Sequence, residues 1–364
     1  MTSQAMPYQG MKAVVMAGGT GGHVFPALSV AEQLRQGGAE VCWLGTARGI
    51  EADLVPKAGI ELNCLTIEGV RGRGLMALLK APFKLLSAVM QARKVLRREG
   101  ANVVLGLGGF ASGPGGVAAK TLGIPVVIHE QNAVAGTTNR WLARVARFCL
   151  EAFPGSLPNA VHVGNPVRSE IGSVAALATP QAERPARLLV LGGSLGARAL
   201  NQLVPQAIAL MAVEQRPEIL HQCGTRLIDE AQQSYAESGV EANVRPFIED
   251  MAKAYEWADL VICRAGALTV SELTMAGRAA MLVPYPYAID DHQAKNAEWL
   301  VNNDAALMCR QEQLTAAKLK ETIELAGTEK AAQMAANAKQ LAMPQAAHEV
   351  AGYCQQAYRE KAHG

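Results

Sequence analysis

Two glycine-rich turns constrain the fold of this 364-residue chain most, because each follows an apolar strand and opens a helix. The apolar segment at 13–16 runs into AGGTGGHVFPA, and the segment at 188–191 runs into GGSLGARAL. Glycine lets backbone N–H groups approach an anion, and the helix start behind each turn adds unpaired donors and a partial positive charge. The pattern predicts two nucleotide-fold domains and a ligand that carries phosphate.

Apolar, strand-like runs alternate with helical stretches along the whole chain. The expected strands are 12–17, 40–44, 102–106, 124–128 and 160–163 in the first half, and 187–191, 218–222, 243–247, 259–262 and 280–283 in the second. Near-continuous apolar strands separated by helices are typical of parallel sheets covered on both faces. We therefore predict an α/β chain with its boundary at an Asn-Pro pair: a domain 1–165, a domain 166–343, and a last helix 344–364 that packs back on the first domain.

The charge of the chain is divided unevenly. Residues 1–168 hold 17 Lys and Arg against 9 Asp and Glu, whereas the rest hold 17 against 23. The net charges of +8 and −6 indicate that the N-terminal half meets something anionic, either phosphates or a membrane face.

The cysteines and the apolar runs limit the compartment. The seven cysteines are scattered without a CxxC pair, so the sequence supports neither a zinc site nor a disulfide framework. Free cysteines of this kind are typical of a reducing compartment. No apolar run reaches the ~18 to 20 residues that a span requires, and no signal peptide begins the chain. We expect a protein that neither spans a membrane nor is exported.

The first glycine turn does not fit a nicotinamide cofactor. In the dinucleotide pattern GxGxxG, Val24 occupies the place of the third glycine, and the strand near 41–44 ends in Gly45 instead of an acid. A single glycine turn can also serve only tight packing. However, a third glycine cluster at 106–114 and the segment 126–132 also follow strands, so we expect these loops to share one opening at the carboxyl ends of the strands.

Several polar side chains stand at these strand ends. His23 directly follows the first glycine turn, which brings an imidazole to the mouth of the expected crevice, either for chemistry or as a purely structural residue. For His129 and Glu130 the alternative to catalysis is an ordinary loop hydrogen bond, which explains His129 better. Glu272 lies about one turn inside a helix, where its carboxylate would accept two vicinal hydroxyls or only stabilise the helix start. The segment 284–293 is either a sugar-binding loop or a solvated turn bounded by proline.

The motifs GGTGGHVFPA, HEQN, GNPVR, GGSLGA, RAGALTVSE and DDHQAKNA, in this order over nearly the whole chain, resemble the MurG family of bacterial glycosyltransferases. This resemblance implies a GT-B fold, in which two Rossmann-like domains with parallel sheets face across a cleft. It implies transfer of N-acetylglucosamine from UDP-N-acetylglucosamine (UDP-GlcNAc) to the C4 hydroxyl of the N-acetylmuramoyl group of lipid I. The product, lipid II, serves peptidoglycan synthesis and thereby cell shape and division.

The resemblance also implies site residues. The donor UDP-GlcNAc would be bound by Thr20, Gly21, Gly22, Asn132, Arg168, Ser194, Ile248, Ala267, Leu268, Thr269, Val270, Ser271, Glu272 and Gln293. Leu195 replaces a Gln that is often expected there, so only its backbone is counted as a donor contact. The implied reaction inverts the sugar carbon, with His23 as the base and Glu130 in reserve. No DxD motif or acid cluster accompanies these residues, so we expect no metal or other cofactor.

A segment that is both basic and apolar lies between the expected strands 40–44 and 102–106. Between Val70 and Lys84, apolar residues at helical spacing stand among cations, which indicates either a helix facing the core or an interfacial patch. The residues expected to meet the acceptor and the membrane are Arg71, Arg73, Leu75, Leu79, Lys80, Phe83 and Arg140, with Arg144 and Arg147 extending the basic face. We predict reversible, peripheral binding to the anionic cytoplasmic surface of the cell membrane.

Two other functions compete with this interpretation. A UDP-GlcNAc 2-epimerase would use the same fold and donor without an acceptor, and a non-enzymatic sugar-nucleotide sensor would keep the donor contacts without needing His23. Nucleic acid binding has little support, because the basic residues lack interleaved aromatic residues.

Overall fold

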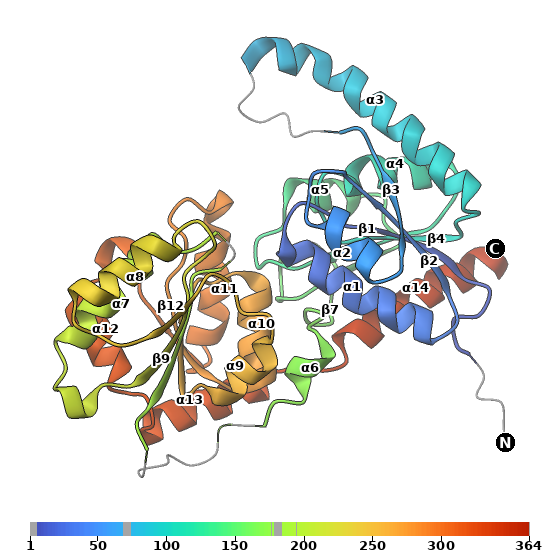
Figure 1. The fold of residues 1–364 in the computed structure, drawn as a ribbon. Helices are drawn as coiled ribbons and strands as arrows, with labels where there is room; N and C mark the ends of the chain where they lie inside the picture. Colours follow the sequence, from blue (N-terminus) through green and yellow to red (C-terminus); the bar gives the residue numbers. More distant parts are fainter. Residues whose placement is uncertain (1–5, 68–73, 176, 178–183, 194, 364) are drawn as a thin grey trace. The chain divides into compact units, whose positions relative to one another are not determined.

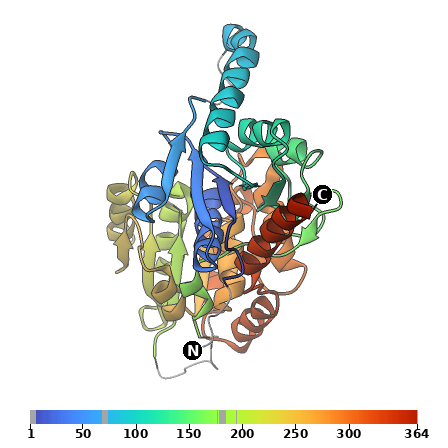
Figure 2. The same cartoon turned by 90° about the vertical axis from the view of Figure 1, so that its right-hand side faces the viewer.

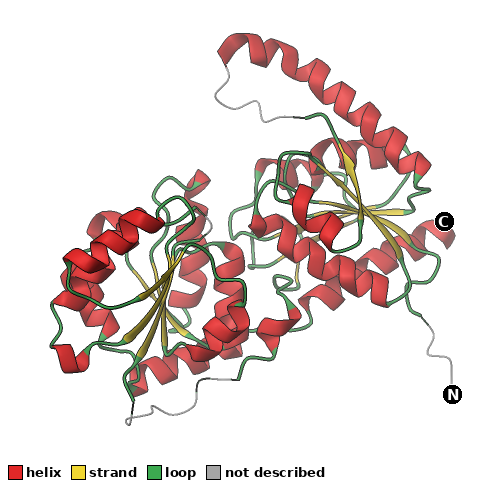
Figure 3. Ribbon diagram, viewed as in Figure 1, coloured by secondary structure: helices red, strands yellow, loops and turns green. Residues whose placement is uncertain are grey.

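The structure is a computed structural model that describes residues 6–67, 74–175, 177, 184–193 and 195–363. Contacts between Cα atoms divide the chain into two units. The N-terminal unit comprises residues 1–168 together with 343–364, and the C-terminal unit comprises residues 169–342 (Figures 1 and 3). Each unit is a parallel sheet with helices on its faces, which confirms the predicted fold class of two Rossmann-like α/β domains.

The N-terminal unit contains a parallel sheet in the order β3-β2-β1-β4-β5-β6-β7. Its strands are β1 Lys12–Met16, β2 Glu40–Gly45, β3 Glu61–Cys64, β4 Val103–Gly106, β5 Val126–Glu130, β6 Phe148–Glu151 and β7 Val161–His162. Its helices are α1 Gly21–Gln36, α2 Glu51–Lys57, α3 Gly74–Arg98, α4 Ser112–Thr121, α5 Thr137–Leu142 and α14 Ala346–His363.

Strand β1 shows why this sheet is covered on both sides. Ala13 and Val15 are buried in one core cluster, and Val14 and Met16 are buried in another. Alternate side chains of a strand point to opposite faces, so an all-apolar strand needs helices on both faces. The last helix, α14, packs against α1 on one of these faces (Figure 2), and its Cys354 is completely buried there.

The C-terminal unit contains a parallel sheet in the order β10-β9-β8-β11-β12-β13. Its strands are β8 Arg187–Leu191, β9 Glu218–Gln222, β10 Asn243–Arg245, β11 Leu260–Cys263, β12 Ala279–Leu282 and β13 Leu307–Met308. Its α-helices are α6 Ser169–Gly172, α7 Arg198–Ala209, α8 Ile228–Glu237, α9 Met251–Trp257, α10 Ala267–Ala276, α11 His292–Val301, α12 Ala316–Ile323 and α13 Glu329–Gln340, and its 3-10 turns are η1 Val213–Gln215, η2 Ile289–Asp291 and η3 Gln311–Gln313.

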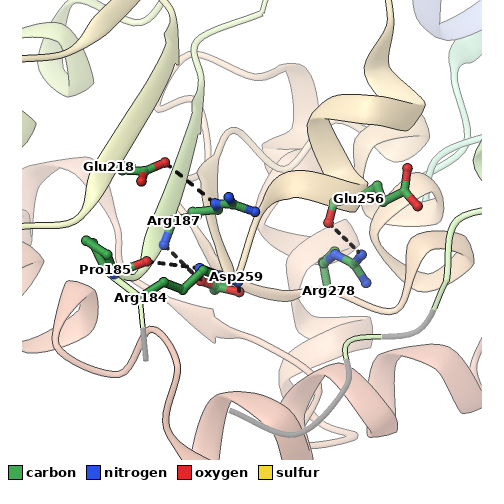
Figure 4. Close-up of polar contacts among 7 residues, drawn as sticks. All are labelled: Arg184, Pro185, Arg187, Glu218, Glu256, Asp259 and Arg278. Atoms are coloured by element: carbon green, nitrogen blue, oxygen red, sulfur yellow. Dashed lines mark hydrogen bonds and ion pairs between the residues drawn. The ribbon is translucent and has the colours of Figure 1, made fainter. Parts of the chain in front are cut away.

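A buried carboxylate fixes the starts of the two central strands of this sheet. Asp259, directly before β11, accepts two hydrogen bonds of 2.7 Å from the guanidinium of Arg184 and one of 2.9 Å from the backbone N–H of Arg187 in β8 (Figure 4). Arg187 in turn pairs with Glu218 at the start of β9, at 3.5 Å. The register of β8, β9 and β11 is therefore set at this end, which leaves the opposite, carboxyl ends for loops.

Every strand expected from the sequence is present, with ends that differ from the expected ones by at most two residues. Three strands of the described residues were not expected: β3, β6 and β13. The first two have only four residues each, with polar side chains among them, and β13 has two residues at a sheet edge. Such short runs carry too little apolar periodicity to stand out from loops.

Candidate active site

In the N-terminal unit, the glycine turn after β1 meets the glycine cluster after β4, because β1 and β4 are neighbours in the sheet. A Cβ atom on Gly109 would lie only 2.5 Å from the carbonyl oxygen of Gly18, so the two backbones touch. Gly109 also has a φ of +83°, which an L-residue rarely adopts. These two loops therefore adjoin at the carboxyl ends of neighbouring strands, and the shared opening expected there stays a prediction.

His23 lies in the first turn of α1, where it faces this glycine contact. Its imidazole is half-buried, and Nδ1 lies 3.4 Å from the hydroxyl oxygen of Thr20, the N-cap residue. A Cβ on Gly108 would come within 2.9 Å of Cδ2 and Nε2 of the ring. The loop after β4 therefore limits where the imidazole can lie, and Gly108 must be a glycine for the ring to keep its place.

Glu51 organises the first glycine turn, a role that was not predicted. Its side chain is completely buried at the start of α2. Oε2 accepts a 2.9 Å hydrogen bond from the backbone N–H of Gly19, while Oε1 accepts bonds from the N–H and the hydroxyl of Thr46 at 3.1 and 2.7 Å. An acid in a first helical turn is usually a solvated residue that stabilises the helix dipole, which is why sequence reasoning passed over Glu51.

Arg168, Gly21 and Phe25 are also brought together in this unit. The guanidinium carbon of Arg168 lies 5.2 Å from the centre of the Phe25 ring, and a Cβ on Gly21 would lie 3.1 Å from the same ring. Thr20 is exposed and Gly22 is half-buried at the helix start. The predicted donor-binding residues of the first turn therefore sit beside the predicted Arg168.

Glu130 does not have the surroundings of a base. Its carboxylate, 2% exposed, accepts hydrogen bonds from the N–H groups of Asn132 and Gly136 at 2.9 and 3.1 Å and from the side-chain amides of Asn132 and Asn139 at 3.3 and 2.9 Å. Both oxygens are thus occupied as acceptors, which argues against the prediction of a reserve base. The contacts instead hold Asn132, the predicted donor-binding residue.

His129 is a buried structural residue, as the hydrogen-bond interpretation expected. Its Nε2 lies 2.8 Å from the carbonyl oxygen of Gly164, and the side-chain amide of Gln131 lies 3.0 Å from Nδ1. Burial lowers the pKa of His129 to about 4, which keeps the ring neutral near pH 7. A neutral ring donates from Nε2 to Gly164 and accepts at Nδ1, so it secures the segment 164–168 that carries Arg168.

In the C-terminal unit, α10 starts directly at the carboxyl end of β11. Gly266 is its N-cap residue and makes no side-chain cap, and the first helical hydrogen bond runs from Val270 N–H to the Gly266 carbonyl at 2.9 Å. The N–H groups of Ala267, Leu268 and Thr269 therefore have no acceptor within the helix. Together with the helix dipole they make the helix start where we predicted that an anion binds, and that binding stays a prediction.

Glu272 lies one turn further into α10 and is 5% exposed. Its Oε2 accepts a 3.0 Å hydrogen bond from the hydroxyl of Tyr255, a residue of α9 that sequence reasoning missed. The predicted Ile248, 8% exposed, precedes α9 in the same unit. Val270 is buried, and the hydroxyl of Ser271 donates back to the Ala267 carbonyl at 3.0 Å.

Two residues that were not predicted hold the loops after β11 and β12. Arg264 donates to the carbonyl oxygens of Val283 and Pro284 at 3.1 and 3.3 Å, and the side-chain amide of Asn296 donates to the Ala265 carbonyl at 3.1 Å. Within the loop, Oε1 of the predicted Gln293 accepts from the N–H of Tyr285 at 2.9 Å. The start of α11 is thereby fixed beside the start of α10.

The second glycine turn follows β8 and packs tightly on the turn after β9. A Cβ on Gly196 would lie 2.2 Å from the Cys223 carbonyl oxygen, and the N–H of Gly192 donates to the Gln222 carbonyl at 2.8 Å. Leu195 is 79% exposed. The predicted Ser194 lies outside the described residues.

The predicted membrane segment falls partly outside the described residues. Arg71 and Arg73 lie outside them, and for Leu75, Leu79 and Lys80 the structure describes the backbone of α3 but not the side chains. Phe83 is 76% exposed, so the alternative of a helix face buried in the core is wrong for this residue.

Other exposed residues lie near Phe83 in the sequence or in the fold. Leu86 and Met90, 62% and 58% exposed, follow Phe83 at helical spacing, and α3 packs on α4, which packs on α5. In α5, Arg140 is exposed, and Trp141 is 67% exposed with the guanidinium carbon of Arg144 5.0 Å from its ring centre. By contrast, Arg147 pairs with Glu360 at 2.5 Å, so part of its charge is compensated.

Within the described part of the chain, no helix is long and apolar enough to cross a bilayer, and no group of three or more His, Cys, Asp and Glu residues is arranged to hold a metal ion.

Two family models match the sequence. The glycosyltransferase family 28 N-terminal domain matches residues 13–150, and the glycosyltransferase family 28 C-terminal domain matches residues 187–350. A protein of Cellvibrio japonicus is 55% identical over 361 residues, covering 96% of this chain and 98% of that protein. A protein of Pseudomonas fluorescens is 52% identical, covering 98% and 100%. Both are named "UDP-N-acetylglucosamine--N-acetylmuramyl-(pentapeptide) pyrophosphoryl-undecaprenol N-acetylglucosamine transferase".

Solved structures are similar over the same extent. The crystal structure of MurG from Acinetobacter baumannii matches with a TM-score of 0.82 and 44% identity, covering 95% of this chain and 99% of that chain. The glycotransferase of kitacinnamycin matches with a TM-score of 0.73 at 17% identity, covering 96% and 99%, which is informative for the fold alone. These similarities confirm the predicted GT-B type.

Proposed function

The chain belongs to glycosyltransferase family 28, and from this premise we propose that it transfers N-acetylglucosamine from UDP-GlcNAc to lipid I. The acceptor is the C4 hydroxyl of the N-acetylmuramoyl group of undecaprenyl-diphospho-muramoylpentapeptide, and the product is the lipid II of peptidoglycan synthesis. The observation that carries the proposal is a pair of glycine-bounded helix starts, one with His23 in α1 and one with Glu272 in α10, each at the carboxyl edge of a parallel sheet.

The donor is bound mainly by the C-terminal unit. The N–H groups of Ala267, Leu268 and Thr269 receive the diphosphate, and the carboxylate of Glu272 accepts the ribose hydroxyls. The backbone of Ile248 meets the uracil. Because Oε1 of Gln293 already accepts from Tyr285, its Nε2 group is the part that donates to the sugar hydroxyls.

His23 is the base that removes the proton from the acceptor hydroxyl. A single displacement with inversion requires the hydroxyl oxygen to attack the sugar carbon from the side opposite to UDP, and a positioned base contributes about 10² to 10⁴-fold. The contact of Gly108 with the ring supports this role, because it restricts the imidazole where the turn after β1 meets the loop after β4. We place Thr20, Gly21, Gly22, Asn132 and Arg168 around the donor sugar and diphosphate from this unit.

The leaving UDP is stabilised by several donors acting together. One helix terminus contributes only ~0.3 to 2 kcal/mol, which is small beside the charge that develops on a diphosphate. The backbone amides of Gly193 and Leu195, with Ser194, add to those of α10, whereas the N–H groups of Gly192 and Gly196 already donate to the carbonyls of Gln222 and Gly193. Preorganised amides in a site with little water provide most of such stabilisation. No step of this scheme needs a metal ion.

The lipid acceptor requires the protein to reach a membrane surface, and we place this contact on the N-terminal unit. Phe83, Leu86 and Met90 form an exposed apolar row on α3. Trp141 and Arg140 of α5, with Arg144 just after this helix, form a second exposed group. Inserted apolar side chains contribute ~1.5 to 3 kcal/mol each, and each cation near an anionic leaflet about 1 kcal/mol. The protein then binds reversibly at the cytoplasmic face of the membrane, as a peripheral protein.

Transfer of radiolabelled N-acetylglucosamine to a lipid I analogue tests the proposed reaction. Label in the lipid product, with no isomerisation of the sugar when lipid is left out, is the expected result. Isomerisation of UDP-GlcNAc without lipid would instead identify a 2-epimerase, and donor binding without any turnover would identify a sensor.

The role of His23 is tested by His23→Ala with His348→Ala as the control, an exposed histidine of α14. We expect His23→Ala to lower kcat by at least about 10²-fold with little change in the Kd of UDP-GlcNAc. Turnover near that of the wild type would remove His23 from this role.

A further inference from the structure

Helix α9 connects two predicted donor contacts of the C-terminal unit. It begins at Met251, three residues after Ile248, and its Tyr255 packs against α10, where Glu272 lies. Tyr255 is completely buried, and its hydroxyl donates a 3.0 Å hydrogen bond to Oε2 of Glu272. A phenol is rigid, with only two side-chain torsions, so it can fix the plane of a longer and more flexible carboxylate side chain.

The far ends of α9 and α10 are held by one guanidinium. Arg278, 2% exposed, donates from Nε to the Tyr255 carbonyl at 2.5 Å and from a terminal nitrogen to the Glu256 carbonyl at 3.4 Å (Figure 4). It also donates to the carbonyls of Ala276 and Gly277 at 2.8 and 3.0 Å. A cation at two helix C-termini is favourable, because the carbonyls there carry partial negative charge. The two helices are thus joined at their C-terminal ends as well as through Tyr255 and Glu272.

This bracing determines how the carboxylate can meet a ribose. A carboxylate has about four acceptor positions, so Oε2 can accept from Tyr255 and the group can still accept two vicinal hydroxyls. The two hydroxyls are met together only when the carboxylate plane is held in one orientation. If the phenol bond is absent, the carboxylate samples other rotamers, and the second hydroxyl adds less to binding.

We propose that the hydroxyl of Tyr255 is a positioning group that fixes Glu272, so that this chain selects a ribonucleoside diphosphate over its 2′-deoxy analogue. The proposal rests on the proposed function, in which Glu272 receives the ribose of the UDP-sugar. It makes Tyr255 a determinant of donor specificity without contact between the phenol and the donor.

The test is calorimetric binding of UDP and 2′-deoxy-UDP to the full-length chain and to Tyr255→Phe. Wild-type protein is expected to bind UDP more tightly than 2′-deoxy-UDP. In Tyr255→Phe, the Kd of UDP should rise about threefold to tenfold while the Kd of 2′-deoxy-UDP changes less than about twofold. The control is Tyr235→Phe, since Tyr235 is a buried tyrosine of the same unit whose hydroxyl lies 2.9 Å from Nδ1 of His221, and we expect it to change neither Kd.

A double-mutant cycle separates positioning from general loosening of the unit. In a Glu272→Gln background, Tyr255→Phe should leave the ratio of the two Kd values unchanged, because the carboxylate it positions is gone. Equal weakening of UDP and 2′-deoxy-UDP in Tyr255→Phe, or an unaltered preference, would overturn the inference while leaving the proposed function in place. A wild-type protein that binds no UDP would overturn the proposed function itself.

Discussion

The buried carboxylate of Glu51 offers the sharpest test of how the first glycine turn holds His23. In Glu51→Gln, one of the two oxygens becomes an NH₂ group. The three partners are all donors to the carboxylate: the N–H groups of Gly19 and Thr46 and the hydroxyl of Thr46. Whichever way the amide turns, at least one backbone N–H faces another donor and loses its acceptor.

The size of the effect follows from these contacts. A buried donor left without an acceptor costs about 1–3 kcal/mol. The side chain has little room to rearrange, because Cβ atoms on Gly18 and Gly49 would lie 2.4 and 1.9 Å from its oxygens. We expect Glu51→Gln to lower the free energy of unfolding by about 1–3 kcal/mol. Displacement of the Gly19 turn, which leads into α1, should lower kcat about 10- to 100-fold, since catalysis is sensitive to shifts of about 1 Å.

Glu151 provides a matched control in the same unit. It is 4% exposed and also accepts three hydrogen bonds, from the N–H groups of Gly155 and Leu157 and the hydroxyl of Ser156, at 2.8 to 3.1 Å. Glu151→Gln should lose similar stability in urea unfolding and keep its kcat in the transfer assay. The Kd of UDP should stay unchanged in Glu151→Gln. If Glu51→Gln loses stability but keeps kcat, or if both variants lose kcat equally, the reasoning is refuted.

Three further predictions concern pH, the membrane and metal ions. Burial lowers the pKa of His129 to about 4 and that of His221 to about 3, so between these values and about pH 6.5 the unfolded chain binds more protons than the folded chain. The contribution of these histidines to the free energy of unfolding is therefore fully present above about pH 6.5, and on acidification it falls by up to about 1.4 kcal/mol per pH unit for each histidine. Equal stability to urea at about pH 5 and pH 7 would contradict this. The double variant Phe83→Ser, Leu86→Ser should bind anionic liposomes at least about tenfold more weakly than the wild type in a sedimentation assay. The control variant Leu210→Ser, Val213→Ser, at exposed sites of the other unit, should bind like the wild type. Equal binding by the two double variants would argue against the proposed patch. Treatment with a chelator should leave the transfer rate unchanged, and complete inactivation that added metal reverses would show that a metal is required.

The parallel sheets could be predicted because many of the strands are continuous apolar runs, and some of the strand-end loops could be predicted because β1, β4 and β8 lead into glycine-rich turns. Strand β1, buried on both faces, and the turn before α1 both follow from the types of residue present. The start of α10 was predictable for a similar reason, since a short turn that ends in Gly266 follows β11.

The residues that hold the site were not predictable, because each acts through a contact that is distant in the sequence. Glu51 meets Gly19 across 32 positions, and Tyr255 meets Glu272 across 17. Nothing local marks a buried acid at a helix start or a phenol in a short helix. Glu130 has a different explanation: its partners lie only two to nine positions away, but an acid at a strand end gives no sign in the sequence that both of its oxygens are occupied. The exposure of Phe83 depended on packing that periodicity alone does not reveal.

The most direct test of the account is the initial rate at which the wild-type chain moves labelled N-acetylglucosamine from UDP-GlcNAc to lipid I in anionic vesicles, compared with that of His23→Ala. We predict lipid-linked product from the wild type and a rate at least about 10²-fold lower from the variant, with UDP binding preserved in both. Absence of lipid-linked sugar from a wild-type protein that is folded and binds UDP would contradict the central claim.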